Sequence, residues 1–161
     1  MKCSPGYYCI SSASSKTPIG LDSGDRCSAG YYCPEGSGKP IPCPPGLACP
    51  NSGMSLEDAG GSNVASTHAM ANPCDAGFYC QYGAVKTAPT AIEDGGQICP
   101  AGYYCPATGH ADNLDETDYL SGTRHPYPCV PGTFRSSTGG ETSADCTSCP
   151  AGYYCPDYAT T

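Results

Sequence analysis

The chain has 161 residues, a formal net charge of −8 and only seven basic residues. Nucleic-acid binding requires clustered Lys and Arg, so this composition argues against that class of function. Leu, Ile, Val and Phe together supply 15 residues, about 9% of the chain, well below the ~20% under which a chain seldom packs a core. A large single hydrophobic core is therefore excluded, and no apolar run approaches the ~18 residues of a membrane-spanning helix.

A cysteine motif recurs seven times along the chain and contains all 14 cysteines. Each copy begins Cys-x-x-Gly, and in six copies a second cysteine follows six residues after the first. Self-similarity of this kind is typical of a tandem array built from one small unit. The seven predicted repeats span residues 1–26, 27–42, 43–73, 74–98, 99–128, 129–148 (with a long loop) and 149–161 (truncated).

Local chemistry predicts a small stapled knot at each copy. Pro-Ala-Gly or Pro-Pro-Gly favours a tight turn, because glycine takes positive φ without a clash, and the Tyr-Tyr pair that follows has high strand propensity. The segments between copies are rich in Gly, Ser, Thr and Pro and unequal in length, so a regular solenoid is not expected. We expect a small disulfide-rich fold: an elongated array of hairpin-like knots with long irregular linkers. Helical turns are expected only within 51–70 and 111–120.

The cysteines are the candidate substitute for a core. Sequence alone leaves their pairing open. Pairing in sequence order explains why repeat 6, which lacks the near cysteine, has a later one, whereas an offset ladder would leave Cys3 without a partner in the chain. The sequential pairs are Cys3–Cys9, Cys27–Cys33, Cys43–Cys49, Cys74–Cys80, Cys99–Cys105, Cys129–Cys146 and Cys149–Cys155.

So many cysteines indicate an oxidising compartment, and hence an extracellular or cell-surface protein. No apolar signal segment precedes Cys3. We therefore expect the chain to be part of a larger protein or to be shown without its leader.

The stretch from Cys129 to Cys149 reads Cys-Val-Pro-Gly-Thr-Phe, a loop rich in Ser, Thr and Gly, then Cys-Thr-Ser-Cys-Pro-Ala-Gly. It resembles the ephrin-receptor-like (GCC2/GCC3) cysteine-rich repeat. The other copies look like a variant of that unit, as in tandem arrays of protist and algal surface and flagellar-hair-like proteins. The resemblance covers the cysteine motifs and not the long linkers. It implies an extracellular module that serves as a spacer, stalk or assembly surface.

The doubled aromatics are the candidate packing and assembly residues, because tyrosine offers rigid contact area with a polar tip. Alternation along a short strand directs one ring toward the local disulfide and the other outward, onto a neighbouring repeat or subunit, or onto a soluble ligand. These residues are Tyr7, Tyr8, Tyr31, Tyr32, Phe78, Tyr79, Tyr103, Tyr104, Tyr153 and Tyr154.

Other candidates are weaker. The acidic group Asp112, Asp115, Glu116 and Asp118 offers oxygens to calcium but lacks the ligand spacing of an EF-hand, so a solvated loop is the competing interpretation. Cys146-Thr-Ser-Cys149 is the only Cys-x-x-Cys in the chain, and a structural zinc site needs four ligands. We expect no metal, no cofactor and no catalytic residues.

Serine and threonine clusters at 11–15 and 136–138 are candidate sites for O-linked glycans, and no Asn-x-Ser/Thr sequon is present.

The sequence thus favours a non-enzymatic extracellular structural protein, a segment of a glycoprotein fibre, coat or filament. Its expected partners are copies of itself or other surface glycoproteins. The alternative is a ligand-binding fragment of a cell-surface receptor, with recognition by the linkers or the outward tyrosines.

Overall fold

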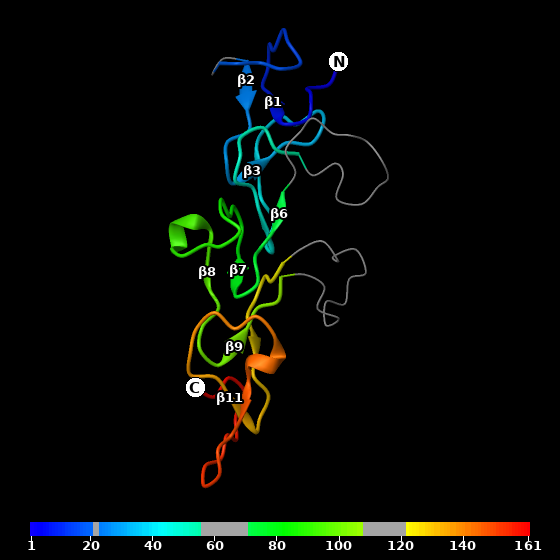
Figure 1. Ribbon diagram of the computed structural model, residues 1–161. Helices are drawn as coiled ribbons and strands as arrows, with labels where there is room; N and C mark the ends of the chain where they lie inside the picture. Colours follow the sequence, from blue (N-terminus) through cyan, green and yellow to red (C-terminus); the bar gives the residue numbers. More distant parts are fainter. Residues whose placement is uncertain (21–22, 56–70, 108–121) are drawn as a thin grey trace.

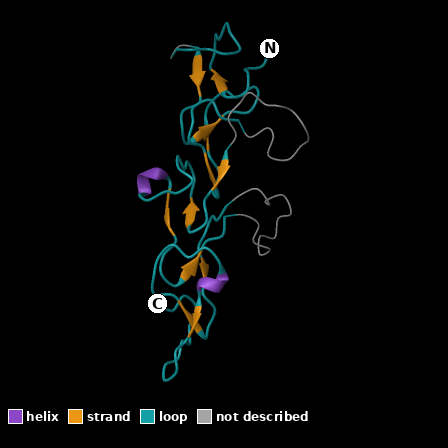
Figure 2. Cartoon of the chain, viewed as in Figure 1, coloured by secondary structure: helices purple, strands orange, loops and turns teal. Residues whose placement is uncertain are grey.

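The computed structural model describes residues 1–20, 23–55, 71–107 and 122–161. The repeats follow one another along an elongated molecule, with β1 near one end and β11 near the other (Figure 1). Strands are short, and loops and turns make up most of the chain (Figure 2). The expected disulfide-rich array of hairpin-like units is confirmed.

Six two-stranded antiparallel sheets lie in the described part of the chain. Each pairs a strand that follows a motif glycine with a strand that ends just before the next cysteine. The pairs are β1 (Tyr7–Cys9) with β2 (Gly24–Arg26), β3 (Tyr31–Tyr32) with β4 (Ile41–Pro42), β5 (Leu47–Ala48) with β6 (Asn72–Pro73), β7 (Phe78–Cys80) with β8 (Gly96–Ile98), β9 (Tyr103–Tyr104) with β10 (Tyr127–Pro128), and β11 (Thr133–Phe134) with β12 (Thr147–Ser148).

The register is the same in all six hairpins. The residue after the motif glycine opposes the residue before the next cysteine, as Tyr31 opposes Pro42, and the following residue opposes the one before that, as Tyr32 opposes Ile41. Each hairpin therefore lies within one repeat, and its loop is the long linker. Within each hairpin-like unit the motif supplies the turn and one strand, and the second strand comes from the end of the linker.

Within the described ranges there are two short 3-10 helices, η1 (Ile92–Asp94) and η2 (Ser143–Asp145). Neither lies where the sequence led us to expect a helical turn. Of the segment 51–70, the described residues 51–55 form a turn and a bridge, and 56–70 lie outside the described residues, as does 111–120. Both helices end on an aspartate whose carboxylate accepts a backbone N–H from the preceding turn, a local interaction that needs no 3.6-residue period.

Disulfides take the place of a core. All seven join cysteines in sequence order, with Cα–Cα distances of 5.6 to 6.1 Å. The sequential pairing is confirmed, and the offset ladder does not occur. Eight cysteines from Cys27 to Cys105, together with Cys129, are fully buried, and the small apolar clusters form around them. No helix among the described ranges is long and apolar enough to cross a membrane.

Candidate functional site: the interface between repeats

Each motif begins with a tight turn of the kind that its sequence predicts. In repeat 1 the Tyr7 N–H donates to the Ser4 carbonyl oxygen at 3.1 Å, and Gly6, third in the turn, has φ of 80°. A type II turn requires positive φ at that position, which glycine adopts without strain. The same i to i+3 bond closes the turn in the other six repeats. Local sequence therefore sets the shape of every knot.

Backbone hydrogen bonds join each knot to the next at the motif glycine. The Gly30 N–H donates to the carbonyl oxygen of Cys49, the second cysteine of the following repeat, at 2.8 Å. The N–H of Cys43, the first cysteine of that repeat, donates back to the Gly30 carbonyl oxygen at 2.8 Å. The same two bonds recur at every junction from repeat 1 to repeat 7, except that at the junction of repeats 5 and 6 the Arg135 carbonyl replaces that of a second cysteine.

A second pair of bonds comes from the turn after the second cysteine, which folds back on the preceding repeat. In repeat 3 the Gly53 N–H donates to the carbonyl oxygen of Cys27 at 2.7 Å, and the Met54 carbonyl oxygen accepts the N–H of Cys33 at 2.9 Å. Equivalent bonds join repeat 2 to 1, repeat 4 to 3, repeat 6 to 5 and repeat 7 to 6. At five of the six junctions, four backbone bonds thus form the same interface, although linkers of unequal length had argued against regularity. At the junction of repeats 4 and 5, the Cys80 N–H donates instead to the Thr123 carbonyl oxygen at 3.0 Å.

This second layer also brings three successive repeats together. A Cβ atom placed on Gly30 would lie 2.8 Å from the carbonyl oxygen of Gly83, two repeats along the chain. Such a Cβ cannot be accommodated without moving backbone, so the motif glycine is required for close approach as well as for the turn. Gly6 and Gly102 face the carbonyl oxygens of Gly53 and Ala159 in the same manner.

The aromatic pairs lie along these junctions. Tyr32 packs against a cluster of Cys43, Cys49 and Met54 in the next repeat, whereas Phe78 packs against a cluster that contains its own disulfide. Most of the other rings in repeats 1 to 5 are half-buried, and Tyr31 is 42% exposed. In repeat 7, Tyr153 and Tyr154 are 76% and 84% exposed.

Two aromatic contacts show how the hairpin register uses these rings. Arg26 lies over the ring of Tyr7, which it opposes across the hairpin, with its guanidinium carbon 5.6 Å from the ring centroid. Tyr104 stacks on Tyr127, its opposite residue, with centroids 5.6 Å apart. Cation–π and stacked pairs in such positions stabilise short strands that have few ladder hydrogen bonds.

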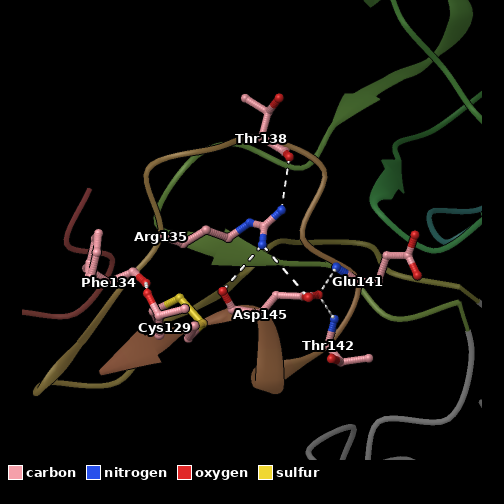
Figure 3. A network of polar contacts seen from close by, with 9 residues as sticks. Cys129, Phe134, Arg135, Thr138, Glu141, Thr142 and Asp145 are labelled. Carbon is pink, nitrogen blue, oxygen red and sulfur yellow. Dashed lines mark hydrogen bonds and ion pairs between the residues drawn. A yellow bond between two sulfur atoms is a disulfide. The ribbon is translucent and has the colours of Figure 1, made fainter. Parts of the chain in front are cut away.

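Repeat 6 replaces the missing near cysteine with an arginine. Arg135 stands six residues after Cys129, and its backbone makes the junction bonds of a second cysteine: its N–H donates to Thr160 at 3.1 Å, and its carbonyl accepts from Gly102 at 2.8 Å. Its guanidinium donates to the carbonyl of Thr138 at 3.1 Å and lies 4.0 Å from Oδ1 of Asp145 (Figure 3). Hydrogen bonds and one ion pair of Arg135 therefore hold the long loop that Cys129–Cys146 closes.

Asp145 organises the same loop. Its Oδ2 accepts the backbone N–H of Thr142 at 2.9 Å and that of Glu141 at 2.8 Å. These two bonds, with a smaller contribution from the nearby Arg135 charge, hold the pKa of Asp145 below its usual range. In repeat 4 the hydrogen-bonded ammonium of Lys86, at 2.8 Å, likewise lowers the pKa of Asp94.

The other candidates from the sequence were two possible metal sites. The calcium candidates Asp112, Asp115, Glu116 and Asp118 lie outside the described residues. Both cysteines of the Cys146-Thr-Ser-Cys149 motif are in disulfides, so neither sulfur is a thiolate ligand. Within the described ranges, no three His, Cys, Asp or Glu side chains gather as metal ligands would.

Sequence reasoning missed Arg135. The signal was available, because this residue occupies the position of the absent second cysteine in the repeat alignment. It also failed to predict the second strand of each hairpin, because the residues just before each first cysteine share no strand-like composition.

In comparisons with known proteins, no protein-family model matches this sequence and no curated protein matches it.

Proposed function

We propose that this chain is an extracellular structural segment, a rod of repeats that forms part of a glycoprotein fibre, coat or filament of the flagellar-hair kind. It has no enzymatic role in this proposal. Its partners are copies of itself or other surface glycoproteins, and O-linked sugars on the Ser and Thr clusters decorate its flanks. The observation that carries the proposal is the four-bond backbone interface, which recurs at five of the six junctions between successive repeats of an elongated molecule.

Three properties support a structural role. Seven disulfides within 161 residues suit an oxidising compartment, where they persist. The contacts between repeats are mostly backbone to backbone, so the linkers can differ in length and sequence without changing the interface. An array whose units contact only near neighbours extends in one dimension, as spacers and fibres do.

Native mass measurement under non-reducing conditions, combined with electron microscopy of the oxidised chain, tests this function. We expect extended particles that associate into larger assemblies, and loss of the extended shape when the disulfides are reduced. A monodisperse monomer that binds a soluble ligand saturably would overturn the proposal and support the receptor alternative. Retained order after complete reduction would contradict the disulfide scaffold.

A further inference from the structure

Repeat 5 contains the one hairpin of the described chain in which two tyrosines oppose each other. Tyr104 of β9 faces Tyr127 of β10, and the two rings stack with their centroids 5.6 Å apart and their planes 26° from parallel. In the other five hairpins, no aromatic residue has an aromatic residue opposite it, as Tyr32 opposes Ile41. The register of one hairpin therefore sets two phenols side by side.

Both tyrosines are attached to backbone that neighbouring disulfides hold in place. Tyr104 precedes Cys105 and Tyr127 lies two residues before Cys129, and both of these cysteines are fully buried and disulfide-bonded. The Cys129 N–H also donates to the Gly102 carbonyl oxygen at 2.8 Å, which joins the two ends of the hairpin. Groups held together in this way react with each other as if each were present at very high concentration.

Adjacent phenols can be joined by oxidation. A phenol that loses one electron and one proton becomes a phenoxyl radical, in which the ring carbons beside the oxygen share the unpaired electron. Two such radicals form a bond between these carbons, and the hydrogen on each joined carbon then moves to the oxygen and restores the phenol. The two tyrosines together give up two electrons and two protons, which reduce one molecule of hydrogen peroxide to two of water. The bond requires the stacked rings to turn edge to edge, which rotation of the side chains supplies.

Exposure and proximity favour different tyrosines of this chain. Tyr31 and Tyr82 are 42% and 70% exposed, so an oxidant reaches them easily. Within the described ranges neither ring stacks on another, so a radical formed there must meet a second chain in order to couple. Tyr104 and Tyr127 are half-buried and keep some contact with solvent. In a dilute solution the pair that is already in contact should therefore couple first.

From these observations we propose that Tyr104 and Tyr127 form a modification site, at which a peroxidase and hydrogen peroxide join the two side chains through a carbon–carbon bond. The bond ties β9 to β10 across the linker of repeat 5, which no disulfide encloses. A reductant that opens the disulfides does not cleave it, so repeat 5 keeps a closed loop after reduction. The inference rests on the proposed function for its oxidising surroundings only. Coupling takes place within one chain and is tested separately from assembly.

Treatment of the disulfide-bonded chain with a haem peroxidase and a limiting amount of hydrogen peroxide tests the inference. The chain is kept dilute, so that coupling between copies is rare. After the disulfides are reduced, trypsin cleaves behind Arg124 and separates Tyr104 from Tyr127, in peptides 87–124 and 125–135. We expect mass spectrometry to find these two peptides joined, with the loss of two hydrogen atoms, and fragment ions to place the bond on Tyr104.

Phenylalanine variants separate the phenol from the ring. Tyr104→Phe and Tyr127→Phe each keep an aromatic ring in the hairpin but remove one hydroxyl, and each should abolish the joined peptide. Tyr103→Phe is the matched control, because Tyr103 is half-buried in the same strand but opposes Pro128; the yield should not change. Near-ultraviolet circular dichroism verifies that each variant is folded before treatment. The parent chain with its cysteines reduced and alkylated should couple its tyrosines without preference for this pair.

Three outcomes would overturn the inference. The first is coupling of other tyrosine pairs in the folded parent as readily as Tyr104 with Tyr127. The second is an absence of coupled tyrosine in the chain while free tyrosine couples in a parallel reaction. The third is an equal yield of the joined peptide from the alkylated chain, which would mean that the hairpin does not select the pair. None of these outcomes bears on assembly, which native mass measurement and microscopy of the untreated chain test.

Discussion

Repeats 5 and 7 contain the same eight residues, Cys-Pro-Ala-Gly-Tyr-Tyr-Cys-Pro, at 99–106 and 149–156. Their motif turns are alike, with glycine φ of 81° and 88° and disulfide Cα–Cα distances of 5.9 and 6.1 Å. Their surroundings differ: Cys99 and Cys105 are fully buried and the tyrosines form β9, whereas Tyr153 and Tyr154 are exposed and unpaired. The turn and the disulfide are local properties of the motif. The strand depends on the segment just before the next first cysteine, Tyr127–Pro128 in repeat 5, and the burial on the repeat that follows.

Removal of one disulfide at a time should give the largest difference between repeats 5 and 7, in how far the loss of structure spreads from the substituted site. The pairs Cys99–Cys105 and Cys149–Cys155 close loops of the same length, so each should destabilise the folded chain by about 2–3 kcal/mol through the unfolded state alone. The double variant Cys99→Ala/Cys105→Ala also disturbs packing on both sides and should unfold repeats 4 to 6 together. Cys149→Ala/Cys155→Ala should loosen repeat 7 only. Hydrogen exchange resolved by residue distinguishes these outcomes, and equal loss of protection at the two sites would contradict the comparison.

Substitution of the motif glycines should give the next largest difference between the two repeats, in the free energy of unfolding. Alanine at either Gly102 or Gly152 must adopt a left-handed conformation, at a cost of about 1–2 kcal/mol. At Gly102 the added Cβ would also overlap the carbonyl oxygen of Ala159, whereas at Gly152 it enters open space. We expect Gly102→Ala to lower the free energy of unfolding substantially more than Gly152→Ala, as measured by guanidinium denaturation of the monomer. Similar values for the two variants would mean that strain in the turn, and not close approach, is why glycine is required.

The second tyrosine of each pair offers a smaller test. Tyr104 is half-buried and stacks on Tyr127, an arrangement worth about 0.5–1.5 kcal/mol beyond simple burial. Tyr104→Ala should lower the midpoint of thermal unfolding, while Tyr154→Ala should leave it unchanged at concentrations where the chain is monomeric. A destabilised Tyr154→Ala monomer would show that the exposed ring has a contact within its own chain.

The smallest of these effects should be that of acid on the loop of repeat 6. Because folding lowers the pKa of Asp145, its contribution to stability is present above the unfolded pKa of about 3.9 and is lost as pH falls through the folded value. Below about pH 4 the N–H groups of Glu141 and Thr142 should therefore exchange faster, after correction for intrinsic rates. Asp145→Asn should remove this pH dependence, and an unchanged profile in that variant would contradict the assignment.

The sequence predicted the parts of this fold that depend on near neighbours. Pro-x-Gly specified the turn, and the six-residue spacing of cysteines allowed the sequential disulfides. It could not indicate β4 or β6, because Ile41-Pro42 and Asn72-Pro73 acquire strand geometry only by pairing with a segment that lies many residues earlier. Unequal linkers concealed the regular junctions for the same reason, since those bonds involve a few residues beside each cysteine.

Repeat 6 shows a second kind of feature that the sequence could not predict, namely contacts between side chains in a long loop. That Arg135 takes over the backbone role of a cysteine follows from its position in the repeat, but its side-chain contacts depend on the path of the loop to Asp145. The calcium, glycan and family expectations concern groups or relationships on which the fold does not bear, and they stay predictions.

The sequential disulfides also determine how the molecule would respond to a pulling force along its length. A load applied at the two ends would pass through each short disulfide loop and then through the linker beyond it, which in repeats 1 to 5 no disulfide encloses. Rupture of one hairpin would release its linker, at up to ~3.6 Å per residue, in steps that differ because the linkers differ in length. Repeat 6 would not lengthen in this way, because Cys129–Cys146 encloses its loop and leaves two residues before Cys149. The five hairpins of repeats 1 to 5 would thus act as extensible links in series with repeat 6, whose loop is released only when its disulfide is reduced.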